Sequence, residues 1–68
     1  MQKFNERLKH IRKSKKITQR AAAEHLSISE RAYQNYEYGN REPYIVTLIA
    51  LADYFGVSID YLVGRTDL

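Results

Sequence analysis

The sequence predicts an all-α protein, a compact five-helix bundle that forms one domain. Three observations lead to this fold class. Apolar residues recur at spacings of three and four along most of the chain, which is the period of a helix with one buried face. Residues that favour helix starts and ends separate these stretches, and no stretch alternates between polar and apolar residues as a strand does. At 68 residues, the chain has the length of one domain.

The first helix is expected from about residue 3 to residue 14. Phe4, Leu8 and Ile11 lie on one face of this segment, which predicts that the face is buried. Residues 7–16, in the later part of this helix and just after it, form the most basic stretch of a chain whose formal net charge is +3. The basic residues and histidine of this stretch are Arg7, Lys9, His10, Arg12, Lys13, Lys15 and Lys16. Such a basic end is typical of a phosphate-binding domain, although a solvated helix face has the same composition.

The second and third helices are expected at residues 18–26 and 29–38, joined by a turn of about three residues. Thr18 and Ser29 are suitable N-caps, because their hydroxyls can accept a hydrogen bond from the first turn of each helix. Gly39 suits the residue after the third helix, where a left-handed backbone is common. Two short helices with a short link indicate a helix-turn-helix, but many other bundles contain the same pair.

The last two helices are expected at residues 44–55 and 58–64. Pro43 disfavours helix immediately before the fourth helix, and Ser58 is a suitable N-cap for the fifth. Residues 65–68 are expected to form a terminal tail or the beginning of a linker.

Composition argues against several classes of function. The absence of cysteine rules out disulfides and thiolate metal sites, and it fits a cytoplasmic protein. His10 and His25 are the two histidines, and neither has a nucleophile or ligand pattern around it, so we expect no enzyme activity and no metal. We also expect no cofactor, no evident small-molecule site and no association with a membrane, because there is no apolar run of about 20 residues.

A pattern between residues 17 and 43 is more specific than any one of its elements. The matching residues are Ile17-Thr18-Gln19, Ala23, Ile28-Ser29, Tyr36-Glu37, Gly39 and Pro43. Their order and spacing resemble the phage-repressor/Cro-type (XRE-like) helix-turn-helix family, whose usual string is roughly LTQ-x-x-LA-x-x-x-GVS-x-x-x-I-x-x-YE-x-G-x-x-P. The resemblance continues to Leu62 and covers nearly the whole chain. It implies a lambda-repressor-like DNA-binding domain over residues 1–68, with the helix-turn-helix at about 18–38.

The resemblance also implies a function. A member of this family binds double-stranded DNA at a specific sequence, reads the major groove with helix 29–38 and regulates transcription, as a repressor in the usual case. The implied partner arrangement is a homodimer on a pseudo-palindromic operator. An alternative stays open, in which the domain is a protein-interaction module, such as an antitoxin or accessory regulator, and DNA binding is secondary.

The candidate base contacts lie on the outward face of the third helix. Their side chains are long or carry amides, as the reading of base edges requires. They are Glu30, Arg31, Gln34 and Asn35. Glu30 differs from the others because DNA phosphates repel a carboxylate, so it can instead act as a filter against some sequences. The candidate phosphate contacts are Thr18, Gln19, Tyr38 and Arg41.

Three further expectations concern packing. The family resemblance implies a structural pair between Arg12 and Glu37 that ties the first helix to the end of the third. The chain departs from the family by having Ala22 where a leucine is usual and Tyr33 where an aliphatic residue is usual, so we expect the tyrosine to occupy the vacated volume. Ser27 replaces the usual turn glycine and stores strain if its φ is positive.

Overall fold

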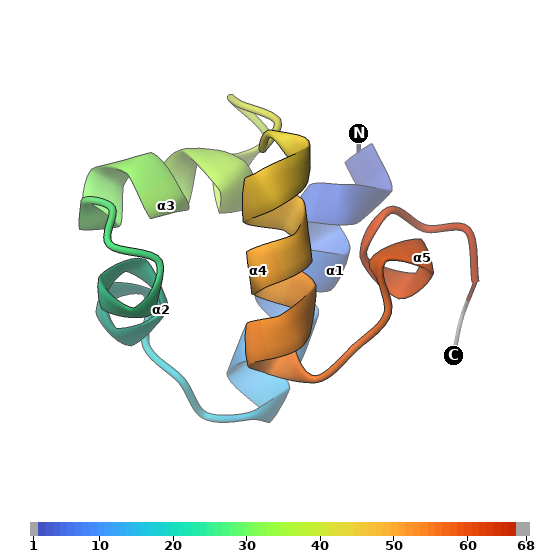
Figure 1. The fold of residues 1–68 in the computed structure, drawn as a ribbon, viewed down its shortest axis with the longest axis horizontal. Helices are drawn as coiled ribbons and strands as arrows, with labels where there is room; N and C mark the ends of the chain where they lie inside the picture. The colour runs from blue at the N-terminus through green and yellow to red at the C-terminus, as the bar shows by residue number, and fades with distance from the viewer. Residues whose placement is uncertain (1, 67–68) are drawn as a thin grey trace.

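The structure, a computed structural model, describes residues 2–66 of the chain. Within this range it contains five helices and no strand, which confirms the predicted all-α fold class. The helices are α1 (Gln2–Ser14), α2 (Gln19–His25), α3 (Glu30–Tyr38), α4 (Ile45–Phe55) and α5 (Ile59–Leu62). In Figure 1, α4 crosses the front of the molecule with α1 behind it, while α2 and α3 lie on one side and α5 on the other.

Local capping fixes where three of the helices begin. Thr18, Ser29 and Ser58 each have an extended backbone, and each hydroxyl accepts a hydrogen bond of 3.0 Å from the backbone N–H three residues later. The predicted starts of α2, α3 and α5 are therefore confirmed. Gly39 ends α3 with a left-handed backbone (φ 80°), as expected. The fifth helix ends at Leu62, two residues before the predicted end.

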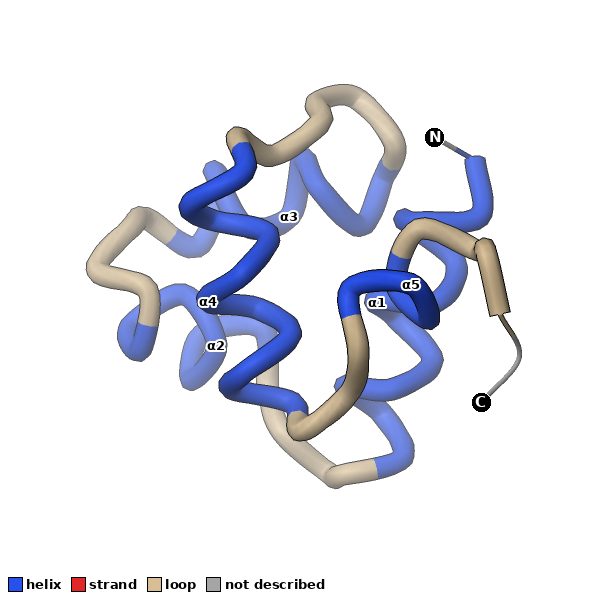
Figure 2. The backbone as a smooth tube through the Cα atoms, turned by 45° about the vertical axis from the view of Figure 1, so that its right-hand side comes forward, coloured by secondary structure: helices blue, strands red, loops and turns tan. Residues whose placement is uncertain are grey.

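All five helices contribute to one hydrophobic core. Its buried members are Phe4, Leu8, Ala22, Ala23, Tyr33, Tyr36, Leu48, Leu51, Ala52, Phe55 and Leu62. Figure 2 shows how the chain reaches this arrangement, with a short turn between α2 and α3 and a longer loop between α3 and α4. Because α3 packs on α1 and α2 through its core face, its opposite face is left at the surface.

The turn between α2 and α3 is strained at Ser27. Its φ is 59°, in the left-handed region where a side chain costs on the order of 1 kcal/mol. The positive φ on which the expectation of strain depended is therefore present. The turn is closed by hydrogen bonds from Ser27 N to Glu24 O (3.1 Å) and from Ile28 N to Ala23 O (3.0 Å). These bonds hold the serine in a conformation that a glycine adopts more readily.

We expect Ser27→Gly to raise the free energy of unfolding by up to about 1 kcal/mol, because glycine relieves the steric cost of the positive φ. Urea denaturation followed by circular dichroism measures this change. Ser29→Ala is the matched comparison in the same turn, and it should lower stability by about 1 kcal/mol by removing the α3 cap. A Ser27→Gly variant that is less stable than the parent would show that the turn carries no relievable strain.

The segment after α5 returns to α1. The backbone N–H of Arg65 donates to Asp60 O (2.8 Å), and Arg7 Nη1 donates to Thr66 O (2.6 Å) and Tyr61 O (3.3 Å). Residues 67 and 68 of the predicted tail lie outside the described residues. None of the helices between residues 2 and 66 combines the length and the apolar character of a bilayer span.

Candidate nucleic-acid interface

A buried ion pair joins α1 to the last turn of α3. Arg12 Nε donates to Glu37 Oε2 at 2.6 Å, and Arg12 Nη2 donates to Glu37 Oε1 at 3.1 Å. Only 9% of Arg12 and 4% of Glu37 is exposed, so both charges are largely removed from water. Arg12 also donates to the carbonyl of Ile17 at 2.9 Å, which fixes the entry to α2. The pair implied by the family resemblance is confirmed.

Tyr33 joins Arg12 and Glu37 in a buried cluster through a hydrogen bond that the sequence did not predict. Its hydroxyl donates to Glu37 Oε2 at 2.6 Å, while its ring is fully buried in the core. Sequence reasoning assigned Tyr33 a packing role because it stands where the family has an aliphatic residue. An aliphatic side chain has no hydroxyl, so the family pattern held no signal for this hydrogen bond.

The environment of the cluster keeps Glu37 ionised. Burial disfavours the carboxylate, but hydrogen bonds from Arg12, Tyr33 and Gln19 outweigh that effect and hold its pKa below the ordinary value. The hydrogen bond to Glu37 raises the pKa of Arg12 despite its burial. Burial, followed by the hydrogen bond to Glu37, raises the pKa of Tyr33 well above its ordinary value. The cluster therefore holds one positive charge, one negative charge and a neutral phenol.

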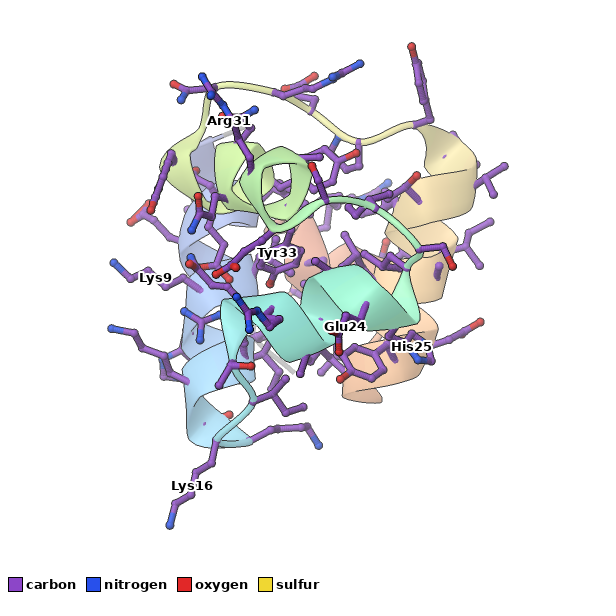
Figure 3. All side chains as sticks on the ribbon, turned by 90° about the vertical axis from the view of Figure 1, so that its left-hand side faces the viewer. Lys9, Lys16, Glu24, His25, Arg31 and Tyr33 are labelled. Carbon is purple, nitrogen blue, oxygen red and sulfur yellow. The ribbon has the colours of Figure 1, made fainter. Side chains whose placement is uncertain are left out.

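The outward face of α3 carries the candidate base contacts. Arg31 is exposed, and Glu30, Gln34 and Asn35 are half-buried. Figure 3 shows Arg31 projecting outward from α3, whereas Tyr33 lies between α3 and the helices beneath it. The division of α3 into an inner aromatic face and an outer polar face agrees with the prediction from the sequence.

Two of the predicted site residues already contact each other. Gln19 Nε2 donates to Glu37 Oε1 at 3.1 Å, and Gln34 Nε2 donates to Gln19 Oε1 at 3.1 Å. Gln19 is thus part of the buried cluster as well as a candidate phosphate contact. The side chain of Gln34 therefore contacts the start of α2 and is not simply a solvated side chain on the surface of α3.

Arg20 belongs to the same surface and was missed by the sequence analysis. Its Nε lies 3.6 Å from Glu30 Oε1, and its side chain is 76% exposed. Arg20 follows directly after Gln19, so its position at the start of α2 was a signal in the sequence for this placement. The arginine offsets the negative charge of Glu30, which lowers the repulsion expected between Glu30 and phosphate.

The remaining candidate phosphate contacts lie at the start of α2, at the end of α3 and in the loop after α3. Thr18 and Arg41 are exposed, and Tyr38 is 60% exposed at the end of α3. The Thr18 hydroxyl accepts a hydrogen bond as the α2 cap, which leaves its own proton available to donate. Arg41 lies in the loop that follows Gly39.

The basic stretch of residues 7–16, along α1 and just after it, separates into structural and exposed residues. Arg12 belongs to the buried pair, and Arg7 binds the segment after α5 and lies 4.7 Å from the Tyr61 ring centre. The exposed members are Lys9, His10, Lys13, Lys15 and Lys16. Figure 3 shows Lys9 projecting outward from α1 and Lys16 projecting from the connection that follows α1. The exposed basic surface is thus smaller than the sequence suggested, because Arg7 and Arg12 have structural roles. It still includes the end of α1 and the connection to α2.

Residues 5–68 match the family model of a helix-turn-helix domain. The chain belongs to this helix-turn-helix family. In this helix-turn-helix domain, α2 and α3 form the motif, and the ion pair of Arg12 with Glu37 anchors its second helix to α1. The family resemblance inferred from the sequence is confirmed.

Curated relatives of this helix-turn-helix domain are named as regulators. It is 49% identical over 59 residues to the uncharacterized HTH-type transcriptional regulator YqaE of Bacillus subtilis, covering 87% of this chain and 51% of YqaE. It is 40% identical to the HTH-type transcriptional regulator ImmR of Bacillus subtilis, covering 96% of this chain and 51% of ImmR. It is also 40% identical to the cryptic phage CTXphi transcriptional repressor RstR of Vibrio cholerae, covering 93% and 56% respectively.

The chain spans about half the length of these relatives. The similarity therefore concerns the helix-turn-helix domain that they share with this chain. No solved structure matches the chain.

Proposed function

We propose that this domain binds double-stranded DNA at a specific sequence and regulates transcription, as a repressor, in the cytoplasm where the DNA lies. The observation that carries the proposal is the outer face of α3, which is polar and is held in place by the buried Arg12–Glu37 pair. Such a helix can enter the major groove as a rigid body. The names of ImmR and RstR support the regulatory role, and RstR supports repression.

The contacts divide by chemistry. Arg31 suits guanine, because its guanidinium can donate to O6 and N7 together, and Asn35 suits adenine through N6 and N7. Glu30 and Gln34 are the neighbouring base contacts, and the Arg20–Glu30 pair keeps the carboxylate from meeting DNA as a bare charge. The proposed phosphate contacts are Thr18, Gln19, Tyr38 and Arg41. The role is one of binding rather than catalysis.

The first test is the salt dependence of binding to random-sequence duplex DNA. A domain that neutralises even two phosphates with lysine or arginine should lose about tenfold in affinity between 50 and 200 mM salt, because bound counterions are released on binding. Fluorescence anisotropy with a labelled duplex measures the slope. A flat or absent response would contradict DNA binding and would favour the alternative, in which the domain is a protein-interaction module.

We further propose that two copies bind one operator as a homodimer. The first two turns of α4 expose an apolar patch formed by Tyr44, Ile45, Val46 and Ile49, which are 75%, 69%, 78% and 43% exposed. This patch follows directly on the loop of Arg41, so a two-fold contact through it keeps both copies against the same duplex. Stable complexes bury roughly 800 Å² on each partner, and four partly exposed side chains bury well under that area. We therefore expect the dimer to form only when both copies are bound to DNA.

We expect Val46→Lys to abolish cooperative binding to a two-half-site operator and to leave the affinity for one half-site unchanged or slightly increased. The lysine places like charges across the two-fold contact and removes apolar surface at its most exposed position. Gel-shift titrations on operators with one and two half-sites measure both quantities. Asp53→Lys adds a charge further along the same helix as a control. Equal cooperativity in the Val46→Lys variant and the parent would rule out this surface.

A further inference from the structure

A chain of hydrogen bonds runs from the buried cluster to the outer part of α3. Glu37 Oε1 accepts from Gln19 Nε2 at 3.1 Å, and Gln19 Oε1 accepts from Gln34 Nε2 at 3.1 Å. Gln19 and Gln34 are both half-buried, and Glu37 is almost fully buried. This series of hydrogen bonds thus begins at Glu37 in the core and ends at Gln34, a candidate base contact.

The buried carboxylate of Glu37 fixes which group donates and which accepts in each of these hydrogen bonds. An ionised carboxylate can accept hydrogen bonds but cannot donate them. Gln19 must therefore turn its amide nitrogen towards Glu37, and this leaves its carbonyl oxygen facing Gln34. Gln34 must in turn present its amide nitrogen, because a flipped amide would set two carbonyl oxygens against each other. Reversal of the Gln34 amide would break this bond without replacing it.

A glutamine on an ordinary helix surface has no such constraint. Its amide can rotate by 180° and exchange donor for acceptor, so it can match bases with opposite patterns. With its orientation fixed, Gln34 offers its second N–H and its carbonyl oxygen on defined sides. In the major groove adenine presents an acceptor, N7, beside a donor, the N6 amine, whereas guanine presents two acceptors and thymine presents O4.

We propose that Gln34 determines specificity for adenine at one position of each half-site, and that Gln19 is the positioning residue that fixes the orientation of its amide. This inference rests on the proposed function as a DNA reader. Gln34 lies on α3 one residue before Asn35 and three after Arg31, next to the other candidate base contacts. Gln19 acts on the base through Gln34 and has its own link to Glu37.

Selection of bound sites from a random duplex pool tests the proposal. The parent chain should select adenine at one position per half-site over the other bases by about 5- to 140-fold, the range for one good bidentate contact. Gln34→Met keeps the length of the side chain and removes the amide, so the preference at that position should fall towards one. Gln19→Ala should relax the same position, because the Gln34 amide is then free to flip.

The base frequencies of the selected sites distinguish a loss of Gln34 positioning from a general loss of DNA affinity. Loss of a phosphate contact at Gln19 lowers affinity for all sequences equally and leaves base frequencies unchanged, whereas loss of positioning changes one column of the selected sites. Glu24→Gln, an exposed change on α2, is the control and should leave every column as in the parent. Circular dichroism establishes that each variant is folded.

The outcomes are distinct. Loss of the adenine preference at one shared position in Gln34→Met and Gln19→Ala, with other positions retained, supports the proposal. Retention of that preference in either variant overturns it while leaving the proposed function intact. Failure of the parent chain to bind duplex DNA overturns the proposed function and this inference together.

Discussion

Replacement of Glu37 with glutamine is expected to lower the free energy of unfolding by about 3–5 kcal/mol. The change keeps the shape of the side chain but leaves the guanidinium of Arg12, which is only 9% exposed, without its counter-charge. It also sets an amide that can donate beside Gln19 and the Tyr33 hydroxyl, which both donate to the carboxylate in the parent. A domain of this size has about this much stability in total, so most molecules should unfold.

Thermal and urea denaturation followed by circular dichroism measure the effect. Glu24→Gln is the matched control, since it removes one exposed carboxylate and should change stability by less than about 0.5 kcal/mol. The double change Arg12→Met with Glu37→Gln should be milder than Glu37→Gln alone, because no unpaired charge remains buried. A Glu37→Gln variant as stable as the parent would contradict a structural role for the pair.

The same cluster predicts the pH dependence of stability. The pKa of Glu37 is held below its ordinary value of 4.5, so its stabilising contribution is complete above that pH and is lost as the pH falls through the folded-state pKa. The pKa of Tyr33 is raised above its ordinary value of 10.0, so its contribution is complete below that pH and declines as the pH rises further. Tyr33→Phe should remove the alkaline decline, and an unchanged alkaline limb would contradict the assignment.

Replacement of Arg31 with alanine is expected to cost about 1–3 kcal/mol per half-site and to relax preference at one base position. On an operator with two half-sites, this amounts to about 30-fold to 10⁴-fold in affinity. The physical reason is that an exposed guanidinium on the outer face of α3 can donate two parallel hydrogen bonds to guanine, which alanine cannot replace.

Arg41→Ala is the charge-matched comparison. It removes the same charge from the loop after α3, so it should weaken binding to all sequences alike and reduce the salt slope by about one. Binding isotherms on the selected operator and on its single-base variants distinguish the two patterns. If Arg31→Ala weakens all sequences equally, Arg31 contacts phosphate and does not read a base.

Most of the fold was predictable because its signals are local. The hydroxyls of Thr18, Ser29 and Ser58 cap helices within three residues of their own position, so the sequence alone places those starts. The end of α3 at Gly39 is local in the same sense. The end of α5 was missed by two residues, because turn hydrogen bonds continue beyond the helix as far as Arg65.

The candidate site was predictable only as a set of positions. Helical spacing separates Arg31 and Asn35 from Tyr33 and Tyr36, and that separation required no tertiary information. By contrast, the hydrogen-bond partners of Gln19 are Gln34 and Glu37, which lie on a different helix. Spacing within one helix does not relate residues of two helices. The Arg20–Glu30 approach was missed for the same reason.

The sequence by itself determined the helices, their caps, the core face of each helix and the polar residues of the outward face of α3, since these follow from backbone propensity and hydrophobic period. Only the tertiary structure decided that Arg7 is bound to the segment after α5, whereas Lys9, two residues later, is exposed. It also decided the orientation of the Gln34 amide, because the hydrogen bonds that link Gln34 to the Glu37 carboxylate pass through Gln19, which lies on another helix, α2.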